Sequence, residues 1–217
     1  MPLRIVLHNA VSADGRITGF VPDMAQYYGL ARRWKEDATL VGSGTLLKPI
    51  EEVPPETPED LLPVPKTPGD KRPLLVVPDS RGRVRIWHAL RRAGYWRGFV
   101  ALCSEKTPKS YLAYLRKRGV EYLIAGRERV DLKKALERLG RRCKLRLIRV
   151  DSGGTLNGLL LREGLVSEIS LVVHPALAGG RADSLIKTPE LGKGIVLKTL
   201  EARRLKNGLV WLRFGVR

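Results

Sequence analysis

The stretch Lys144-Leu-Arg-Leu-Ile-Arg-Val-Asp-Ser-Gly-Gly-Thr-Leu-Asn-Gly-Leu-Leu-Leu-Arg-Glu-Gly164 joins a strand pattern, a glycine turn and a helix pattern, and it decides the predicted fold. Basic and aliphatic residues alternate over 144–150, which predicts a strand with at least one buried face. The strand ends at Asp151, and residues 152–154 follow as a turn with little side-chain bulk.

A short helix is predicted directly after this turn. Thr155 is a good N-cap residue, Leu156 opens an apolar run, and Gly164 ends it. The unpaired N–H groups and the positive end of the helix dipole face whatever lies over the turn, so Gly153 and Gly154 predict a phosphate cradle. A tight connection without a ligand is the alternative interpretation of this glycine pair.

Outward from this stretch, strands and helices alternate along the chain. Strand patterns occupy 3–8, 38–42, 72–77, 98–103, 120–125 and 144–150. Helix patterns occupy 24–37, 107–118 and 132–139. Such alternation needs crossover connections and predicts an α/β fold with a mainly parallel sheet. Asn207-Gly208 lies between the strand patterns 201–206 and 209–216, which predicts an antiparallel hairpin at the C-terminus.

Length and composition favour one enzyme-sized domain. We expect a single domain over 1–217, with a Pro-rich surface excursion at 49–73. The net charge of +18 attracts anions of every kind, but the 40 Lys and Arg residues are spread along the chain and accompany no nucleic-acid recognition motif. Nucleic acid is therefore an unlikely partner, and a phosphorylated substrate is favoured.

The chain shows no pattern for a membrane, a metal or a disulfide framework. No signal peptide or long apolar run is seen, the three His residues are isolated, and only Cys103 and Cys143 are present. We expect a cytoplasmic protein without a bound metal.

The turn after the strand 74–77 predicts the choice of cofactor. Ser80, Arg81 and Arg83 would offer several charge-assisted donors to a ribose 2′-phosphate, which favours NADPH. Asp79 is the competing signal, because an NAD site places a carboxylate where it accepts from the 2′-hydroxyl. A solvated Arg-rich turn without a ligand is the structural alternative.

Several motifs together resemble a known family, the reductase of riboflavin biosynthesis, in its free-standing archaeal and fungal form and as the C-terminal domain of the bacterial bifunctional protein. They are Gly153-Gly-Thr-Leu-Asn157, Glu163-Gly-Leu-Val166, Ser167-Glu168, Pro175 with Gly179-Gly180, Ser12-Ala-Asp-Gly-Arg-Ile17, and Asp37-Ala38 with Val41-Gly42 and Thr45. The family usually has Glu-Gly-Gly where Asp151-Ser152-Gly153 stand, Asp-Glu where Ser167-Glu168 stand, and in many members Asp where Pro49 stands.

The resemblance implies a dihydrofolate-reductase-like fold, an NADPH-dependent reduction and a homodimer. The substrate would be 2,5-diamino-6-ribosylamino-4(3H)-pyrimidinone 5′-phosphate, whose ribosyl group is reduced to ribityl. The implied cofactor contacts are Thr45, Ser80, Arg81, Gly82, Arg83, Val130, Gly153, Gly154, Thr155 and Leu156. The implied substrate contacts are Asn9, Ser12 and Glu168.

Two carboxylates are candidates for the reacting centre. Asp14 is the first choice and Asp151 the second, and each has the alternative of serving only as a turn or cap residue. Two other functions stay open: another pteridine-type or nitro-aromatic reductase on the same fold, or a basic nucleic-acid-binding protein. The homodimer is also expected because the apolar segments 169–173 and 209–212 are predicted to be sheet edges.

Overall fold

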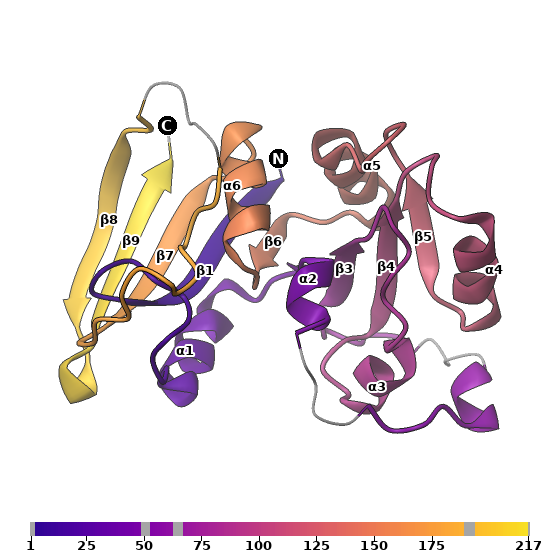
Figure 1. Cartoon of the computed structure of the whole chain (residues 1–217), viewed down its shortest axis with the longest axis horizontal. Helices are drawn as coiled ribbons and strands as arrows, with labels where there is room; N and C mark the ends of the chain where they lie inside the picture. Colours follow the sequence, from indigo (N-terminus) through magenta and orange to yellow (C-terminus); the bar gives the residue numbers. More distant parts are fainter. Residues whose placement is uncertain (1–2, 49–52, 63–66, 189–193, 217) are drawn as a thin grey trace. The chain divides into compact units, whose positions relative to one another are not determined.

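The computed structural model describes residues 3–48, 53–62, 67–188 and 194–216, and it divides the chain into two compact units. The first unit consists of Met1–Glu36 and Arg146–Arg217, and the second of Asp37–Leu145. Each is described separately below, and most of their helices and strands are labelled in Figure 1. The expectation of a single domain stays a prediction.

The first unit contains a mixed sheet with the strand order β6-β1-β7-β9-β8. These strands are β6 (Leu147–Val150), β1 (Arg4–Ser12), β7 (Glu168–His174), β9 (Val210–Val216) and β8 (Leu197–Arg204). Strands β6, β1 and β7 are parallel, whereas β9 runs antiparallel to both β7 and β8. The predicted C-terminal hairpin is confirmed, and its turn places Asn207 and Gly208 at φ values of 59° and 73°. An Asn-Gly pair tolerates this left-handed backbone.

Helices cover both faces of this sheet. They are α1 (Met24–Ala31) with the 3₁₀ turn η1 (Arg32–Trp34), and α6 (Gly154–Arg162). His8 and Asn9 are neighbours on β1 and so point to opposite faces. His8 bonds to Tyr27 of α1, while Asn9 bonds to Asn157 of α6, so the two helices lie on opposite faces.

The face of α1 contains a buried chain of hydrogen bonds that fixes the tautomer of His8. The carbonyl of Tyr27 can only accept, so Nε2 of His8 carries the proton and donates to it at 3.0 Å. Nδ1 therefore accepts from the Ser170 hydroxyl at 3.0 Å, and Ser170 accepts from the Trp211 indole N–H at 2.9 Å. Burial lowers the pKa of His8 to about 4, so the ring is neutral.

The second unit contains a parallel sheet with the strand order β5-β4-β3-β2. Its strands are β2 (Ala38–Leu40), β3 (Leu74–Pro78), β4 (Gly98–Cys103) and β5 (Glu121–Ile124). Its helices are α2 (Ser43–Leu46), η2 (Pro58–Leu61), α3 (Trp87–Arg92), α4 (Lys109–Lys117) and α5 (Leu132–Cys143). The core is built around Trp87, Tyr111 and Leu115, each at most 1% exposed.

Three predictions about elements were wrong in detail. The helix predicted at 24–37 ends earlier because η1 follows α1, and Lys35 then takes a left-handed conformation at φ 46°. The N-cap of α6 is Gly153 rather than Thr155, which lies inside the helix. The segments 169–173 and 209–212 are not sheet edges, since β7 lies between β1 and β9, and β9 between β7 and β8.

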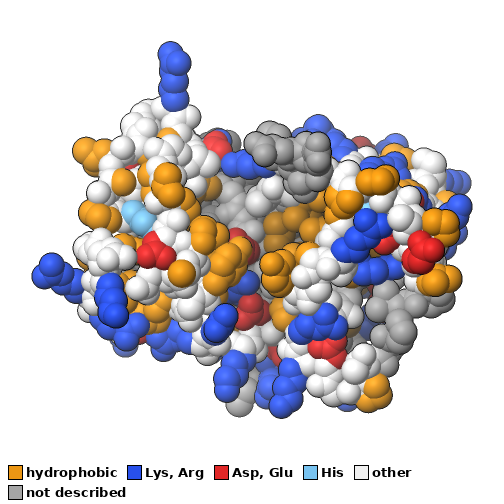
Figure 2. Space-filling view, turned by 90° about the horizontal axis from the view of Figure 1, so that it is seen from below, with side chains coloured by type: hydrophobic (Ala, Val, Ile, Leu, Met, Phe, Trp, Pro, Cys, Tyr) orange, Lys and Arg blue, Asp and Glu red, His pale blue; other side chains and the backbone are white. Residues whose placement is uncertain are grey.

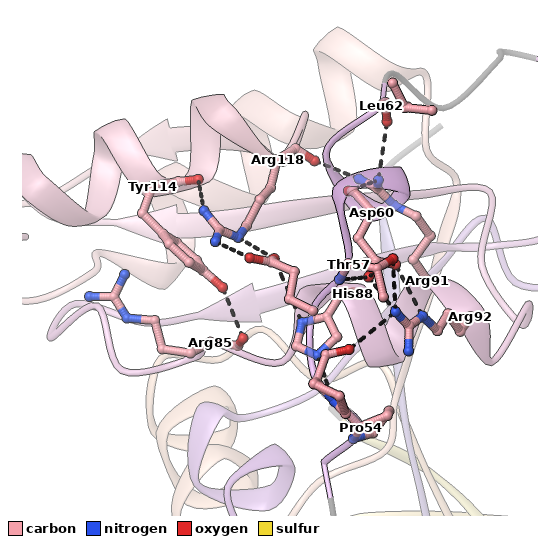
Figure 3. A network of polar contacts seen from close by, with 12 residues as sticks. Pro54, Thr57, Asp60, Leu62, Arg85, His88, Arg91, Arg92, Tyr114 and Arg118 are labelled. Carbon is pink, nitrogen blue, oxygen red and sulfur yellow. Dashed lines mark hydrogen bonds and ion pairs between the residues drawn. The ribbon is translucent and has the colours of Figure 1, made fainter.

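The described part of the Pro-rich excursion is tied to α3 and α4 by ion pairs (Figure 3). Glu56 accepts from Nε of Arg118 at 2.6 Å, and Asp60 accepts from Nε of Arg92 at 3.1 Å. Hydrogen bonds from Arg92 first, and from the Thr57 backbone, lower the pKa of Asp60 to about 2. These contacts anchor residues 53–62 on the unit, although the sequence showed no role for them.

Candidate functional site

The polar residues at the carboxyl ends of β6 and β1 form the candidate site of the first unit. Asp151 follows β6 directly, and its carboxylate accepts from the Tyr27 hydroxyl at 3.0 Å and from Nη1 of Arg149 at 3.1 Å. Arg149 is buried and also donates to Glu36 at 2.7 Å. Burial opposes its charge, but Asp151 and Glu36 outweigh that effect and raise the pKa of Arg149. Asp151 is therefore held in place by a permanently charged partner.

Asn9 connects β1 to the turn and to α6. Its Nδ2 donates to the carbonyl of Ser152 at 2.9 Å, and its Oδ1 accepts from Asn157 at 3.1 Å. Asn157 also donates to the carbonyl of Leu185 at 3.0 Å. Asn9 is 7% exposed, so its amide is committed to holding these segments together beside Asp151.

Asp14 holds two loops together. Its carboxylate accepts from the Ser12 hydroxyl at 2.6 Å and from the backbone N–H groups of Ala178 and Gly179 at 3.0 and 2.9 Å. These bonds, that from Ser12 first, lower the pKa of Asp14 to about 2. The group is thus a carboxylate at neutral pH whose oxygens already have donors.

The glycine at the start of α6 makes room for the chain itself. A Cβ on Gly154 would lie 2.2 Å from the carbonyl oxygen of Ser184, and one on Gly158 would lie 2.4 Å from that of Lys187. The backbone N–H of Lys187 also donates to the carbonyl of Gly154 at 2.9 Å. The segment 184–188 therefore packs directly on one side of α6, and this packing explains why residue 154 has no side chain.

The N-terminus of α6 still lacks a side-chain cap. Its N-cap is Gly153, which can supply no acceptor, and Thr155 in the first turn is exposed. The first N–H groups of a helix have no partner within the helix, so this end suits an anion. Leu156, the next residue, is buried.

Glu168 lies away from the other predicted substrate contacts. It is the first residue of β7, whereas Ser12 is paired with His174 at the other end of that strand, about 20 Å along it. Glu168 is 2% exposed and accepts from Arg213 at 2.6 Å and from Arg4 at 3.1 Å. The structure brings Asn9, Ser12 and Asp14 to one end of the sheet and leaves Glu168 at the other.

The predicted cofactor turn of the second unit lies at the carboxyl end of β3. The side chain of Asp79 points inward, is 1% exposed and accepts from the backbone N–H of Val84 at 2.8 Å. Gly82 has φ 65°, and a Cβ there would meet the ring of Tyr111 at 2.7 Å, so glycine is required. Arg81 and Arg83, on either side of Gly82, are exposed.

Ser80 and Val130 are brought together across two loops. The Ser80 hydroxyl accepts from the backbone N–H of Val130 at 2.9 Å, which leaves its hydrogen for another acceptor. Thr45 lies in α2 at the carboxyl end of β2 and is exposed. Pro49, where the family has an Asp, lies outside the described residues. The predicted cofactor contacts of this unit thus all lie at the carboxyl edge of its sheet, where open α/β sheets bind ligands.

Three further observations concern metal ions, surface charge and membranes. The described residues contain no group of three or more His, Cys, Asp or Glu side chains suited to a metal ion. On the face shown in Figure 2, Lys and Arg side chains lie at many separate places rather than in one continuous patch. No helix within the described part of the chain is long and apolar enough to span a membrane.

Sequence reasoning missed Tyr27 and Arg149. Arg149 lies inside a strand pattern in which basic residues alternate with aliphatic ones, and this pattern alone does not mark it as buried or functional. Its burial between Glu36 and Asp151 depends on contacts between distant segments. The only available signal was an Arg two residues before an Asp, which is too common to be informative.

An α/β fold with anion-suited turns at the carboxyl ends of its strands is typical of proteins that bind phosphorylated ligands, and comparison with known proteins identifies the family. Residues 4–211 match the family model of the RibD C-terminal domain, and the chain belongs to this family. It is 34% identical over 185 residues to the 2,5-diamino-6-ribosylamino-4(3H)-pyrimidinone 5′-phosphate reductase of Methanothermobacter thermautotrophicus, covering 82% of this chain and 80% of that protein.

Two further comparisons describe the extent of the likeness. The riboflavin biosynthesis protein RibD of Actinobacillus pleuropneumoniae is 26% identical over 88% of this chain, which spans only 49% of that longer protein. The crystal structure of a pyrimidine reductase-like protein from Corynebacterium diphtheriae superposes with a TM-score of 0.74 at 19% identity, covering 99% of this chain and 92% of that one. The predicted riboflavin-reductase family and its fold are confirmed.

Proposed function

We propose that this protein is an NADPH-dependent reductase that converts the ribosyl group of 2,5-diamino-6-ribosylamino-4(3H)-pyrimidinone 5′-phosphate to ribityl in riboflavin biosynthesis. Family membership supports the reaction. The observation that carries the choice of cofactor is the inward carboxylate of Asp79, because it leaves only the donors of Ser80, Arg81 and Arg83 on the outer side of the turn. A 2′-phosphate needs such donors, and a 2′-hydroxyl needs an acceptor.

The chemistry requires one hydride and one proton. In the ring-opened substrate, C1 of the sugar is doubly bonded to nitrogen, and the cofactor supplies a hydride to C1 while a proton goes to the nitrogen. The protein must hold the two reactants in line and neutralise their phosphates. Neither task needs a protein nucleophile or a metal.

We assign different tasks to the two candidate carboxylates. Asp14 already has three donors and a low pKa, so it positions the loop at 178–179 rather than delivering a proton. Asp151 has one donor on each oxygen and is partly exposed, which leaves room for a substrate hydroxyl. Tyr27 and Arg149 act through Asp151 as positioning residues.

We further propose that the α6 N-terminus binds the cofactor diphosphate, and that Thr45, Gly82 and Val130 line the cofactor site of the second unit. Asn9 and Ser12 shape the substrate side, whereas Glu168 has a structural task at the other end of β7. A cytoplasmic location agrees with the biosynthetic role.

We also propose a homodimer, on a different ground from sheet edges. Leu171, Val173, Val210, Leu212 and Phe214 point to one face of β7 and β9, and each is half-buried or exposed. An apolar sheet face of this kind suits a second copy of the chain, since an identical face is equally apolar.

One assay separates the proposed function from its alternatives. The purified protein is incubated with NADPH and the phosphorylated ribosylamino-pyrimidine, and loss of the NADPH absorbance band is followed. Oxidation only with a pteridine or a nitro-aromatic compound would identify a different reductase. If none of these compounds is reduced and the protein binds RNA, the assignment as an enzyme is wrong.

A further inference from the structure

Three loops at the carboxyl edge of the second unit are joined by hydrogen bonds. The backbone N–H of Val130 donates to the Ser80 hydroxyl at 2.9 Å, and the Thr107 hydroxyl donates to the Ser80 carbonyl at 2.9 Å. The backbone N–H of Lys106 donates to the carbonyl of Arg127 at 3.1 Å. The loops 80–83, 104–107 and 126–130 therefore form one continuous surface.

This surface carries a strong excess of positive charge. Its exposed cations are Arg81, Arg83, Lys106, Arg127 and Arg129, and its exposed carboxylates are Glu105 and Glu128. None of the five cations forms an ion pair with another residue that the structure describes. Elsewhere in this unit, Arg72, Arg92 and Arg118 form ion pairs with Asp70, Asp60 and Glu56.

The backbone that carries the two later arginines is fixed. Gly126 has φ 89°, and a Cβ there would lie 2.2 Å from the carbonyl oxygen of Arg129, so the loop turns tightly at this point. The Ser104 hydroxyl donates to the carbonyl of Glu128 at 3.3 Å. Only side-chain freedom would be lost when these arginines bind an anion, which favours affinity.

Arg129 precedes Val130, Val130 bonds to Ser80, and Ser80 precedes Arg81, so guanidinium groups from both loops can approach the same anion. We propose that Arg127 and Arg129 bind the ribose 2′-phosphate together with Arg81 and Arg83, so that two loops set the preference for NADPH. This inference rests on the proposed function. Guanidinium groups suit this task because their planar donors match phosphate oxygens.

The test measures binding of 2′,5′-adenosine diphosphate and of 5′-adenosine monophosphate by calorimetry, because these fragments differ by the phosphate in question. The double replacement Arg127→Ala with Arg129→Ala should weaken binding of the diphosphate at least about tenfold and leave the affinity for the monophosphate unchanged. All the arginines replaced are exposed, so the fold should be retained.

A matched control removes two exposed charges elsewhere. Lys117→Ala with Arg141→Ala acts in the last turns of α4 and α5, at the opposite edge of the sheet, and should change the diphosphate affinity less than twofold. The inference is overturned if Arg127→Ala with Arg129→Ala changes the diphosphate affinity no more than this control does, while Arg81→Ala with Arg83→Ala abolishes diphosphate binding. In that case the turn at 80–83 alone would bind the 2′-phosphate. Equal affinity of the unmodified protein for both fragments would overturn the choice of NADPH as well.

Discussion

Asp79 accepts a hydrogen bond from the backbone N–H of Val84, five residues further along the chain, and its side chain is 1% exposed. A carboxylate buried to this extent is out of reach of a ribose 2′-hydroxyl on the surface of the turn. In a turn that carries both an Asp and two Arg residues, the direction of this carboxylate supports the proposal that the turn binds a 2′-phosphate.

We therefore expect NADPH to be preferred over NADH by at least about tenfold in kcat/KM. Arg81→Ala with Arg83→Ala should reduce that preference substantially while barely changing the NADH rate, because only the 2′-phosphate meets these donors. Initial rates with each cofactor provide the measurement. Equal efficiency of the unmodified enzyme with both cofactors would contradict the prediction.

The start of α6 offers a test of the diphosphate site that leaves the packing intact. Gly154→Val would force its side chain against Ser184 and should destabilise the protein whatever the cofactor does. Thr155→Asp is the better variant, since residue 155 is exposed and a negative charge stabilises a helix N-terminus by about 0.3–1 kcal/mol. We expect the KM for NADPH to rise about tenfold through repulsion of the diphosphate.

Thr155→Asn provides the neutral control for this experiment. Its side chain is close in size to that of Asp but carries no charge, so the KM for NADPH should stay within about twofold of the unmodified enzyme. A KM that is unchanged in both variants would assign the glycine turn a purely structural role.

His8 predicts a loss of stability in mild acid. Its pKa is about 4 in the folded protein because of burial, compared with the ordinary 6.5 in the unfolded chain. The unfolded state therefore takes up a proton first as the pH falls below 6.5, and the folded state loses stability down to pH 4. Between pH 7 and pH 5 the loss from this group should be about 2 kcal/mol.

Urea unfolding at the two pH values measures this loss. The pKa values of Asp14, Asp60 and Asp70 are lowered to about 2. The stability that these carboxylates contribute is therefore lost mainly below pH 5, outside the range from pH 7 to pH 5. The His8→Gln variant should have a lower free energy of unfolding than the unmodified protein at pH 7, because two buried hydrogen bonds are disturbed. Its free energy of unfolding should fall less between pH 7 and pH 5. An identical loss in both proteins would show that His8 is not responsible.

The apolar face of β7 and β9 predicts the assembly state. Light scattering should give about twice the 24.2 kDa mass of one chain at micromolar concentration. Leu212→Arg places a charge in the middle of this face and should shift the mass to that of a monomer. Lys198→Glu, an exposed change that points to the other face, should leave the dimer intact.

The local patterns of the sequence predicted the strands and most helices because period and turn residues are local properties. The alternation over 144–150 and the Asn207-Gly208 turn were sufficient for β6 and for the hairpin. Strand order depends on pairing between segments that are distant in the sequence. The apolar run at 169–173 would have the same sequence pattern whether β7 lay at an edge or inside the sheet.

The structure shows where the predicted site residues lie, whereas their roles stay predictions. Residues after strands were correctly expected at the carboxyl edge, yet the direction of the Asp79 carboxylate depends on the position of Val84 in the folded turn. Gly154 was recognised as a necessary glycine, but its neighbour is a segment thirty residues later in the chain. Such partners become visible only when the chain is folded.

The ion pairs of the excursion have a consequence for how this protein can change over evolutionary time. In a chain with 40 basic and 22 acidic residues, a new arginine is easily accommodated, whereas a lost carboxylate at Glu56 or Asp60 would leave Arg118 or Arg92 without its partner. Residues next to Glu56 and Asp60 should therefore vary more among natural sequences than these two residues themselves. Residues of the excursion could be randomised in a library, and cells that depend on this protein could be selected for growth without added riboflavin. Sequencing the survivors would show whether Glu56 and Asp60 are retained.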